Sequence, residues 1–355
     1  ARLRALRSQM EKHQLDAWVL PSSDPHNSEY MPLRWKVRQF MSGFTASVST
    51  MVVLKDAAYV WADGRYWLQA EQELAGTDIQ IVYLGRPDVL PWNQWLAEHL
   101  PEGALLGFYG ATMMVKAVAD IEEKLKSKRI SVQTEHDLVD AVWVDRPGFP
   151  MAPVFAHAMA YAGESAQDKL NRVRDQMRKL DAQVHVLNAL DDIGYLLNLR
   201  GTDVPTSPYF HAYLVVAQQS AILYAHLPRF SADLVQSLKE QGVELKPYDV
   251  FFDDLKALAG QAVLADPAQS NLLTFKQLRS FNCRLIEKRA PSIAMKAVKN
   301  SIELDNWKNC FVRDGIAMVR FLNWFYKHVG AGNLTERMVS DQIDGERAKL
   351  NLFRG

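Results

Sequence analysis

Cysteine is scarce in this sequence: Cys283 and Cys310 are the only two among 355 residues. Two cysteines so far apart do not indicate a disulfide framework or a zinc site, so we expect both thiols to be reduced and buried. Excess charge is lacking too, because 41 Lys and Arg residues face 41 Asp and Glu residues. No net field then draws the molecule to nucleic acid or to an anionic membrane, and nucleic-acid binding is a poor first hypothesis.

Long apolar runs are also missing. The start, Ala1-Arg2-Leu3-Arg4, leads into an amphipathic pattern without the apolar core of a signal peptide, and no run is long enough to cross a bilayer. The sequence has no His-Glu-x-x-His motif, no close Cys/His cluster and no glycine-rich phosphate loop followed by Lys-Ser/Thr. We therefore expect a cytoplasmic protein with no metal or nucleotide bound to this chain.

What the sequence does contain is the composition of a globular protein, with 48% hydrophobic and 23% charged residues. Its length suffices for two or three domains with separate cores. Short apolar runs with strand character alternate with charged, helix-periodic segments, which indicates α/β layers. The expected strands are 17–20, 50–54, 58–61, 79–82 and 105–108 in the first part, and 184–187, 213–216, 221–224 and 262–265 in the second.

An internal repeat relates the two parts. A shift of 167 positions superimposes one amphipathic helix, strand and exit loop on another, and it aligns Arg7 with Arg174 and Met10 with Met177. Two related domains in tandem are the simplest explanation, because two copies are too few for a solenoid. We expect the central sheets of the two domains to share one strand order.

The best linker is the proline-rich segment 146–153, which has no helical period. The domains are therefore expected at 1–150 and 151–297, with a third region at 298–355. In that region a long helix follows Asn300-Ser301-Ile302-Glu303, which has the pattern of a capping box. Its apolar positions follow the 3.6-residue period at Trp307, Cys310, Phe311, Gly315, Met318, Val319, Leu322 and Phe325. A second helix is expected at about 335–350, and the two must pack on the second domain or begin a third.

Several runs resemble the long, three-domain form of aminopeptidase P, a relative of prolidase and creatinase. They include Pro21-Ser22-Ser23-Asp24-Pro25-His26-Asn27-Ser28-Glu29-Tyr30, Ala62-Asp63-Gly64-Arg65-Tyr66, Asn198-Leu199-Arg200-Gly201-Thr202-Asp203-Val204 and Lys296-Ala297-Val298-Lys299-Asn300. The runs occur in family order across nearly the whole chain. The resemblance implies two tandem creatinase/prolidase N-terminal-type domains, each a mixed sheet flanked by helices, followed by the first helices of a truncated pita-bread catalytic domain.

The same resemblance implies the activity of the parent protein. Enzymes of this family release an N-terminal residue that precedes proline, with two metal ions, usually manganese, held by two Asp, one His and two Glu. Those ligands are expected beyond the equivalent of Gly355, so this chain would carry no catalytic or metal residue. It would position peptides with proline at the second position and support a homodimer. The alternative is a non-catalytic protein-binding module, because related domains occur in inactive relatives such as a histone-chaperone subunit.

Arg65 is the one site residue that the resemblance transfers, because the matching arginine in similar enzymes contacts the substrate. Its guanidinium has the fork geometry that suits a peptide carbonyl or carboxylate. Considered alone, the local sequence favours a structural pair between Arg65 and Asp63. We expect Arg65 at the surface, facing a catalytic domain or a dimer partner.

Other polar residues have structural interpretations. Asp24 and His26 follow a strand in an Asp-Pro turn, and turn chemistry is the preferred interpretation over a cleft. Arg200 and Asp203 suggest a salt bridge between domains. His185 lies in an apolar strand and is expected to be a hydrogen-bonded core histidine. The loop 43–50 lacks two glycines that relatives usually carry, which changes the backbone angles available to it, so an identical loop conformation is not assumed.

Overall fold

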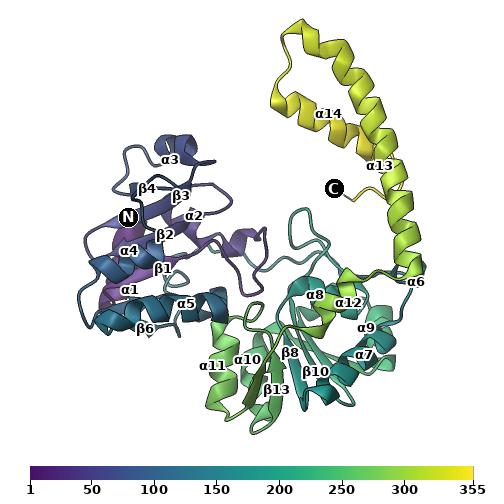
Figure 1. The fold of residues 1–355 in the computed structure, drawn as a ribbon, viewed down its shortest axis with the longest axis horizontal. Helices are drawn as coiled ribbons and strands as arrows, with labels where there is room; N and C mark the ends of the chain where they lie inside the picture. The colour runs from purple at the N-terminus through teal and green to yellow at the C-terminus, as the bar shows by residue number, and fades with distance from the viewer. Residues whose placement is uncertain (355) are drawn as a thin grey trace.

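The computed structural model describes residues 1–354, which form two α/β domains followed by a helical hairpin (Figure 1). The first domain is built on a six-stranded mixed sheet of order β4-β3-β2-β1-β5-β6. Strands β1, β2 and β3 pair antiparallel, and the outer pairs β3–β4, β1–β5 and β5–β6 are parallel. The strands are β1 Ala17–Leu20, β2 Thr50–Leu54, β3 Ala58–Asp63, β4 Gln80–Leu84, β5 Leu105–Gly107 and β6 Ser131–Gln133.

Both faces of the first sheet are covered. In β1, Trp18 and Leu20 point to one core and Ala17 and Val19 to the other, because successive side chains of a strand alternate between faces. All four are at most 2% exposed, which is why this strand reads as an unbroken apolar run. The helices are α1 Arg2–Lys12, α2 Val37–Ser42, α3 Trp67–Glu73, α4 Trp92–His99 and α5 Val115–Leu125, with short 3₁₀ turns η1 Leu33–Trp35, η2 Gly110–Thr112 and η3 Lys126–Lys128.

The second domain repeats the first. Its sheet has the order β12-β11-β10-β8-β13-β14, with the same sequence of antiparallel and parallel pairs. The predicted repeat is therefore confirmed in strand order and direction. The strands are β8 Val184–Leu187, β10 Ala212–Ala217, β11 Ala221–Ala225, β12 Val243–Pro247, β13 Ala262–Ala265 and β14 Arg284–Glu287, and a separate pair joins β7 Phe155–Ala156 to β9 Leu199–Arg200.

Helices on the two faces of the second sheet complete two further cores, one around α7 and one around α10 and α11. The α7 helix buries Leu170, Val173 and Met177 on the stripe that the sequence indicates. The helices are α6 Met159–Ala162, α7 Ala166–Lys179, α8 Leu190–Leu196, α9 Ala232–Glu240, α10 Phe251–Asp254, α11 Leu272–Ser280 and α12 Pro291–Ala297, with 3₁₀ turns η4 Leu227–Arg229, η5 Tyr248–Val250 and η6 Leu255–Leu258. The linker 146–153 has neither helix nor strand; domain limits at 150 and 297 stay predictions.

Backbone hydrogen bonds join the two domains. The Val115 N–H donates to the Ser270 carbonyl at 3.1 Å, and the Leu272 N–H donates to the Met113 carbonyl at 2.8 Å. The buried side chain of Asn271 donates to the carbonyl of Pro25 at 2.9 Å. The start of α11 is thereby tied to the start of α5.

The C-terminal hairpin consists of α13 Ser301–His328, η7 Val329–Ala331 and α14 Glu336–Ala348, and it extends away from the second domain (yellow-green to yellow in Figure 1). The predicted capping box is confirmed: Asn300 accepts from the Glu303 N–H, and the Glu303 carboxylate accepts from the Asn300 N–H, both at 2.9 Å. Only Ala317 of α13 is buried, and the apolar stripe of this helix is largely exposed.

One expectation about the cysteines is wrong. Cys283 is buried, but Cys310 is exposed. Cys310 lies on α13, where no element among residues 1–354 covers the predicted apolar stripe. The helical period identifies which residues share a face of a helix, but it does not establish that the face is covered.

Candidate functional site

Arg65 lies in the turn after β3, where it holds Asp63 in a two-pronged ion pair. Its Nε donates to Asp63 Oδ1 at 3.0 Å and its Nη2 to Oδ2 at 2.8 Å, and the Arg65 backbone N–H also donates to Oδ1. These bonds with Arg65 lower the pKa of Asp63. The Arg65 side chain is 67% exposed, so the expected surface position is confirmed and the local pair with Asp63 is present too. A pair so open to solvent contributes little to stability and can exchange for another partner.

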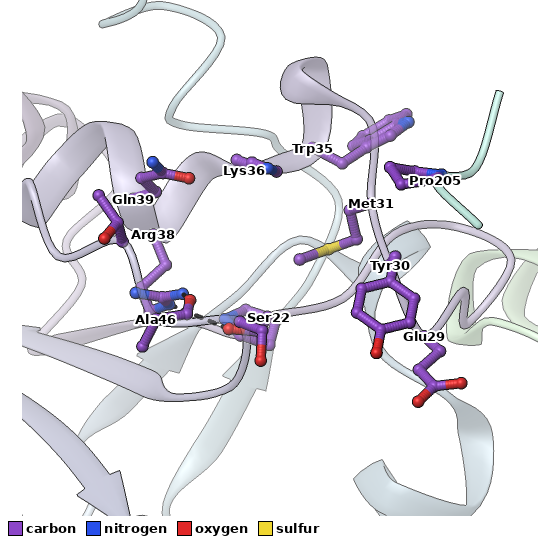
Figure 2. A pocket seen from close by; sticks show the side chains of 13 residues that line it. Ser22, Glu29, Tyr30, Met31, Trp35, Lys36, Arg38, Gln39, Ala46 and Pro205 are labelled. Carbon is purple, nitrogen blue, oxygen red and sulfur yellow. Dashed lines mark hydrogen bonds between the residues drawn. The ribbon is translucent and has the colours of Figure 1, made fainter. Parts of the chain in front are cut away.

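A pocket lies beside this turn. The Tyr66 hydroxyl is 2.6 Å from Ser47 Oγ, and the Arg65 guanidinium is 5.1 Å from the centre of the Tyr66 ring. Ser47 is part of the wall of a pocket of about 200 Å³ (Figure 2). Residues from the exit of β1, from η1 and α2, from the 43–50 loop and from the second domain line it: Pro21, Ser22, Glu29, Tyr30, Met31, Trp35, Lys36, Arg38, Gln39, Thr45, Ala46, Ser47 and Pro205.

Arg38 lines the pocket and is 4% exposed. Figure 2 shows its side chain reaching from α2 toward Ser22 and Ala46. Its Nε donates to Ser22 Oγ at 3.0 Å, its Nη1 to the Phe44 carbonyl at 2.7 Å and its Nη2 to the Ala46 carbonyl. Burial lowers the pKa of Arg38 to about 10, partly offset by Glu73. The guanidinium therefore remains charged at neutral pH.

A second polar cluster is buried between the domains. Asp24, at the exit of β1, accepts the backbone N–H groups of His26 and Ser28, so the predicted turn chemistry is confirmed. The other carboxylate oxygen lies 3.5 Å from Nε2 of His211 in the second domain. His26 contacts the Asn188 carbonyl through Nδ1 and the Tyr248 hydroxyl through Nε2, both at 2.8 Å. The turn thus also carries interdomain contacts, which the sequence interpretation missed.

The predicted interdomain salt bridge of Arg200 and Asp203 is wrong. Arg200 donates instead to the carbonyls of Gly194 and Leu199. Asp203 binds both guanidinium prongs of Arg229, one of them at 2.7 Å, and lies 3.2 Å from Nδ1 of His211. Asp203 is 5% exposed and therefore has no access to solvent or to a substrate.

Opposite pKa shifts separate the two histidines of this cluster. Burial lowers the pKa of His26 to about 3, with a further decrease from His211. Burial also disfavours charge on His211, but its contacts with the carboxylates of Asp203 and Asp24 outweigh that effect and raise its pKa. The pKa of Asp24 is lowered to about 2, because the attraction of His211 outweighs the penalty of burying the carboxylate. A neutral His26 and a protonated His211 are the consistent assignment, and the cluster links the domains.

His185 is a core histidine, as predicted. It is 1% exposed and its Nδ1 lies 2.9 Å from the Leu264 carbonyl in the neighbouring strand. Burial lowers the pKa of His185 to about 4, so the ring is neutral. A neutral imidazole enclosed in the core cannot contact a substrate.

The described part of the chain contains no group of three or more His, Cys, Asp or Glu side chains placed to hold a metal ion. Structural and catalytic metal sites need several such ligands to converge. The residues present therefore do not fit the two-metal centre that the family resemblance implies, and no reaction step is assigned to them. Within residues 1–354, no helix combines the length and apolar character required to cross a membrane.

Comparison with known families defines the class of fold. Residues 2–142 and residues 145–303 each match a family model described as Creatinase/Prolidase N-terminal domain. The tandem sheets, the α/β layers and both matches agree with the fold class expected from the sequence. The chain therefore carries two creatinase/prolidase N-terminal domains.

Relatives narrow the assignment further. Over its full length the chain is 33% identical to a probable Xaa-Pro aminopeptidase P of Laccaria bicolor, and it covers 56% of that protein. Over 99% of its length it is 31% identical to aminopeptidase P1 of Lotus japonicus, and it covers 63% of that protein. It also superimposes with a TM-score of 0.90 on the X-prolyl aminopeptidase of Caenorhabditis elegans, a cytosolic enzyme with a di-nuclear active site. That match has 26% identity and covers 99% of this chain and 60% of the nematode chain. The chain belongs to the aminopeptidase P family, and it spans less than two thirds of these relatives' length.

Sequence reasoning found Arg65 but not the pocket beside it. The pocket combines residues from 21–47 with Pro205, so its lining comes from two domains. Lys36 and Arg38 stand two positions apart in the sequence, a spacing that signals no binding motif. The role of Arg65 in binding substrate stays a prediction.

Proposed function

We propose that this chain is the N-terminal, substrate-positioning part of an Xaa-Pro aminopeptidase. The observation that carries the proposal is the agreement over the whole chain with the nematode enzyme, at a TM-score of 0.90. The parent protein would hydrolyse peptides with proline at the second position and release the residue before it. Two metal ions, manganese in our proposal, would be held by the remainder of the parent protein and would supply the activated water.

The exposed stripe on the C-terminal hairpin supports this assignment. Trp307, Phe311 and Val319 are 52%, 62% and 68% exposed. Side chains of this size rarely remain open over several turns of a helix unless another surface covers them. We infer that the hairpin begins the pita-bread catalytic domain, whose remainder covers the stripe. A homodimer in the cytoplasm is the expected state of the complete enzyme.

Arg65 would contact the peptide by exchanging its exposed pair with Asp63 for a carbonyl or carboxylate of the substrate. Because the backbone N–H of Arg65 also binds Asp63, the turn retains one of these contacts when the guanidinium leaves. A hydrogen bond to a charged group contributes about 1.5–3 kcal/mol, or roughly 10- to 150-fold in kcat/KM.

The test uses the parent protein loaded with manganese and matched peptides, X-Pro-Y and X-Ala-Y. We expect release of X from the proline peptide and little from the alanine peptide. Arg65→Ala should reduce kcat/KM for X-Pro-Y with an unchanged melting temperature, and Arg65→Lys should retain part of it. If a folded, metal-loaded parent protein cleaves neither peptide, the proposal is wrong. The protein-binding module then becomes the better interpretation.

A further inference from the structure

The pocket beside the Arg65 turn contains positive charge that the protein does not neutralise by contact. Arg38 is buried, and among residues 1–354 no carboxylate lies within ion-pair distance of it; its three bonds go to one hydroxyl and two carbonyls. A guanidinium has five N–H donors, so two remain without a partner in this set of bonds. Buried charges in proteins are normally paired, because an isolated charge is costly to bury.

Further polar groups around the pocket are also disengaged. Lys36 is half-buried and lines the pocket beside Arg38, and no ion pair or side-chain hydrogen bond within residues 1–354 engages its ammonium group. The same holds for the side-chain amide of Gln39 and for the carboxylate of Glu29 on the exposed rim. The pocket therefore offers donors and charge to a ligand without first breaking bonds of the fold.

The rest of the lining is apolar. Met31, Trp35 and Ala46 are at most 8% exposed, and Tyr30 stands at the rim opposite Arg38 (Figure 2). Such walls suit a ligand that joins a charged group to a hydrocarbon or aromatic side chain. A volume of about 200 Å³ has room for one end of a chain molecule.

The charge of the pocket selects among anions. The lining contains two cations, Arg38 and Lys36, and one carboxylate, Glu29, which leaves one excess positive charge. That balance suits a monoanion, whereas a phosphate dianion would be under-neutralised and repelled by Glu29. A carboxylate can also accept two parallel N–H bonds from a guanidinium fork.

We propose that this pocket binds the C-terminal carboxylate of the peptide substrate, with Arg38 and Lys36 supplying the charge and Trp35 and Tyr30 contacting the last side chain. The inference rests on the proposed function. The hydrogen bond between the Ser47 and Tyr66 hydroxyls places the pocket wall next to the Arg65 turn, so one peptide can meet both. The site would make the parent enzyme favour peptides with a free C-terminus that reaches the pocket.

The experiment compares X-Pro-Y peptides with a free carboxylate and with a C-terminal amide, cleaved by the parent enzyme. Lys36→Met removes the accessible charge and retains the aliphatic stem. Lys116→Met is the matched control, because Lys116 is exposed and lies outside the pocket. Arg38 is not the first choice, since its bonds to Phe44 and Ala46 support the loop and its removal endangers the fold.

In the wild-type enzyme we expect a lower KM for the acid than for the amide. Lys36→Met should raise KM for the acid about three- to tenfold, leave KM for the amide and kcat unchanged, and retain the melting temperature. Lys116→Met should change nothing. Equal KM values for acid and amide in the wild type, or equal effects of Lys36→Met on both, would overturn the pocket assignment while X-Pro cleavage persists. Loss of cleavage of both peptides by the wild type would instead overturn the proposed function.

Discussion

Replacing Asp203 by alanine should destabilise the second domain strongly. Asp203 is 5% exposed and is the carboxylate that faces both Arg229 and His211. Its removal leaves a buried guanidinium without its counter-ion, and breaking a buried pair in this way costs about 3–5 kcal/mol. In a domain of roughly 150 residues each kcal/mol lowers the melting temperature by about 2–4 °C, so the expected decrease is roughly 6–20 °C.

The assay is urea denaturation and thermal melting, both followed by far-UV circular dichroism, because all nine tryptophans lie outside the second domain. Asp175→Ala is the control, because Asp175 forms an ion pair with Arg178 in which both side chains are more than half exposed. Exposed pairs contribute about 0–1 kcal/mol, so this control should melt close to the wild type. If the unfolding free energies of Asp203→Ala and Asp175→Ala agree within about 0.5 kcal/mol, the buried cluster is not what stabilises the domain.

Three further outcomes are expected. Because the folded state raises the pKa of His211, the contribution of this histidine to stability is complete below about pH 6.5 and is lost as pH rises through the raised pKa. His211→Gln should flatten that part of the plot of stability against pH. Parallel plots for the variant and the wild type would contradict the raised pKa of His211. In urea unfolding, Gly163→Ala should destabilise the protein by about 1–3 kcal/mol more than Gly76→Ala does. Both glycines have positive φ, but a Cβ on Gly163 would lie 2.8 Å from Ile302 Cβ, whereas a Cβ on Gly76 would meet nothing within 4 Å. Equal losses of stability would refute the close contact at Gly163. Calorimetric titration of the 355-residue chain with Mn²⁺ should detect no stoichiometric site of micromolar affinity, equivalent to about 8 kcal/mol, and such a site would refute the ligand argument.

Local patterns in the sequence were sufficient for the architecture. The stripe of Leu170, Val173 and Met177 and the unbroken apolar run of β1 both follow from the geometry of a single element. The capping box at Asn300 is equally local, because its partner is three residues away. Since the two domains share these short-range patterns in the same order, the repeat was readable before any contact between domains was known.

Polar contacts between residues far apart in the sequence could not be predicted from local patterns. Asp203 pairs with Arg229, 26 positions later, instead of with Arg200, and His26 meets Tyr248, 222 positions away. An alternation of apolar and polar residues records which face of an element is buried, but not which other element it will meet. The pocket at Arg38 and the exposed face of Cys310 depend on how domains dock, because burial and pairing are properties of surfaces brought together by the whole chain.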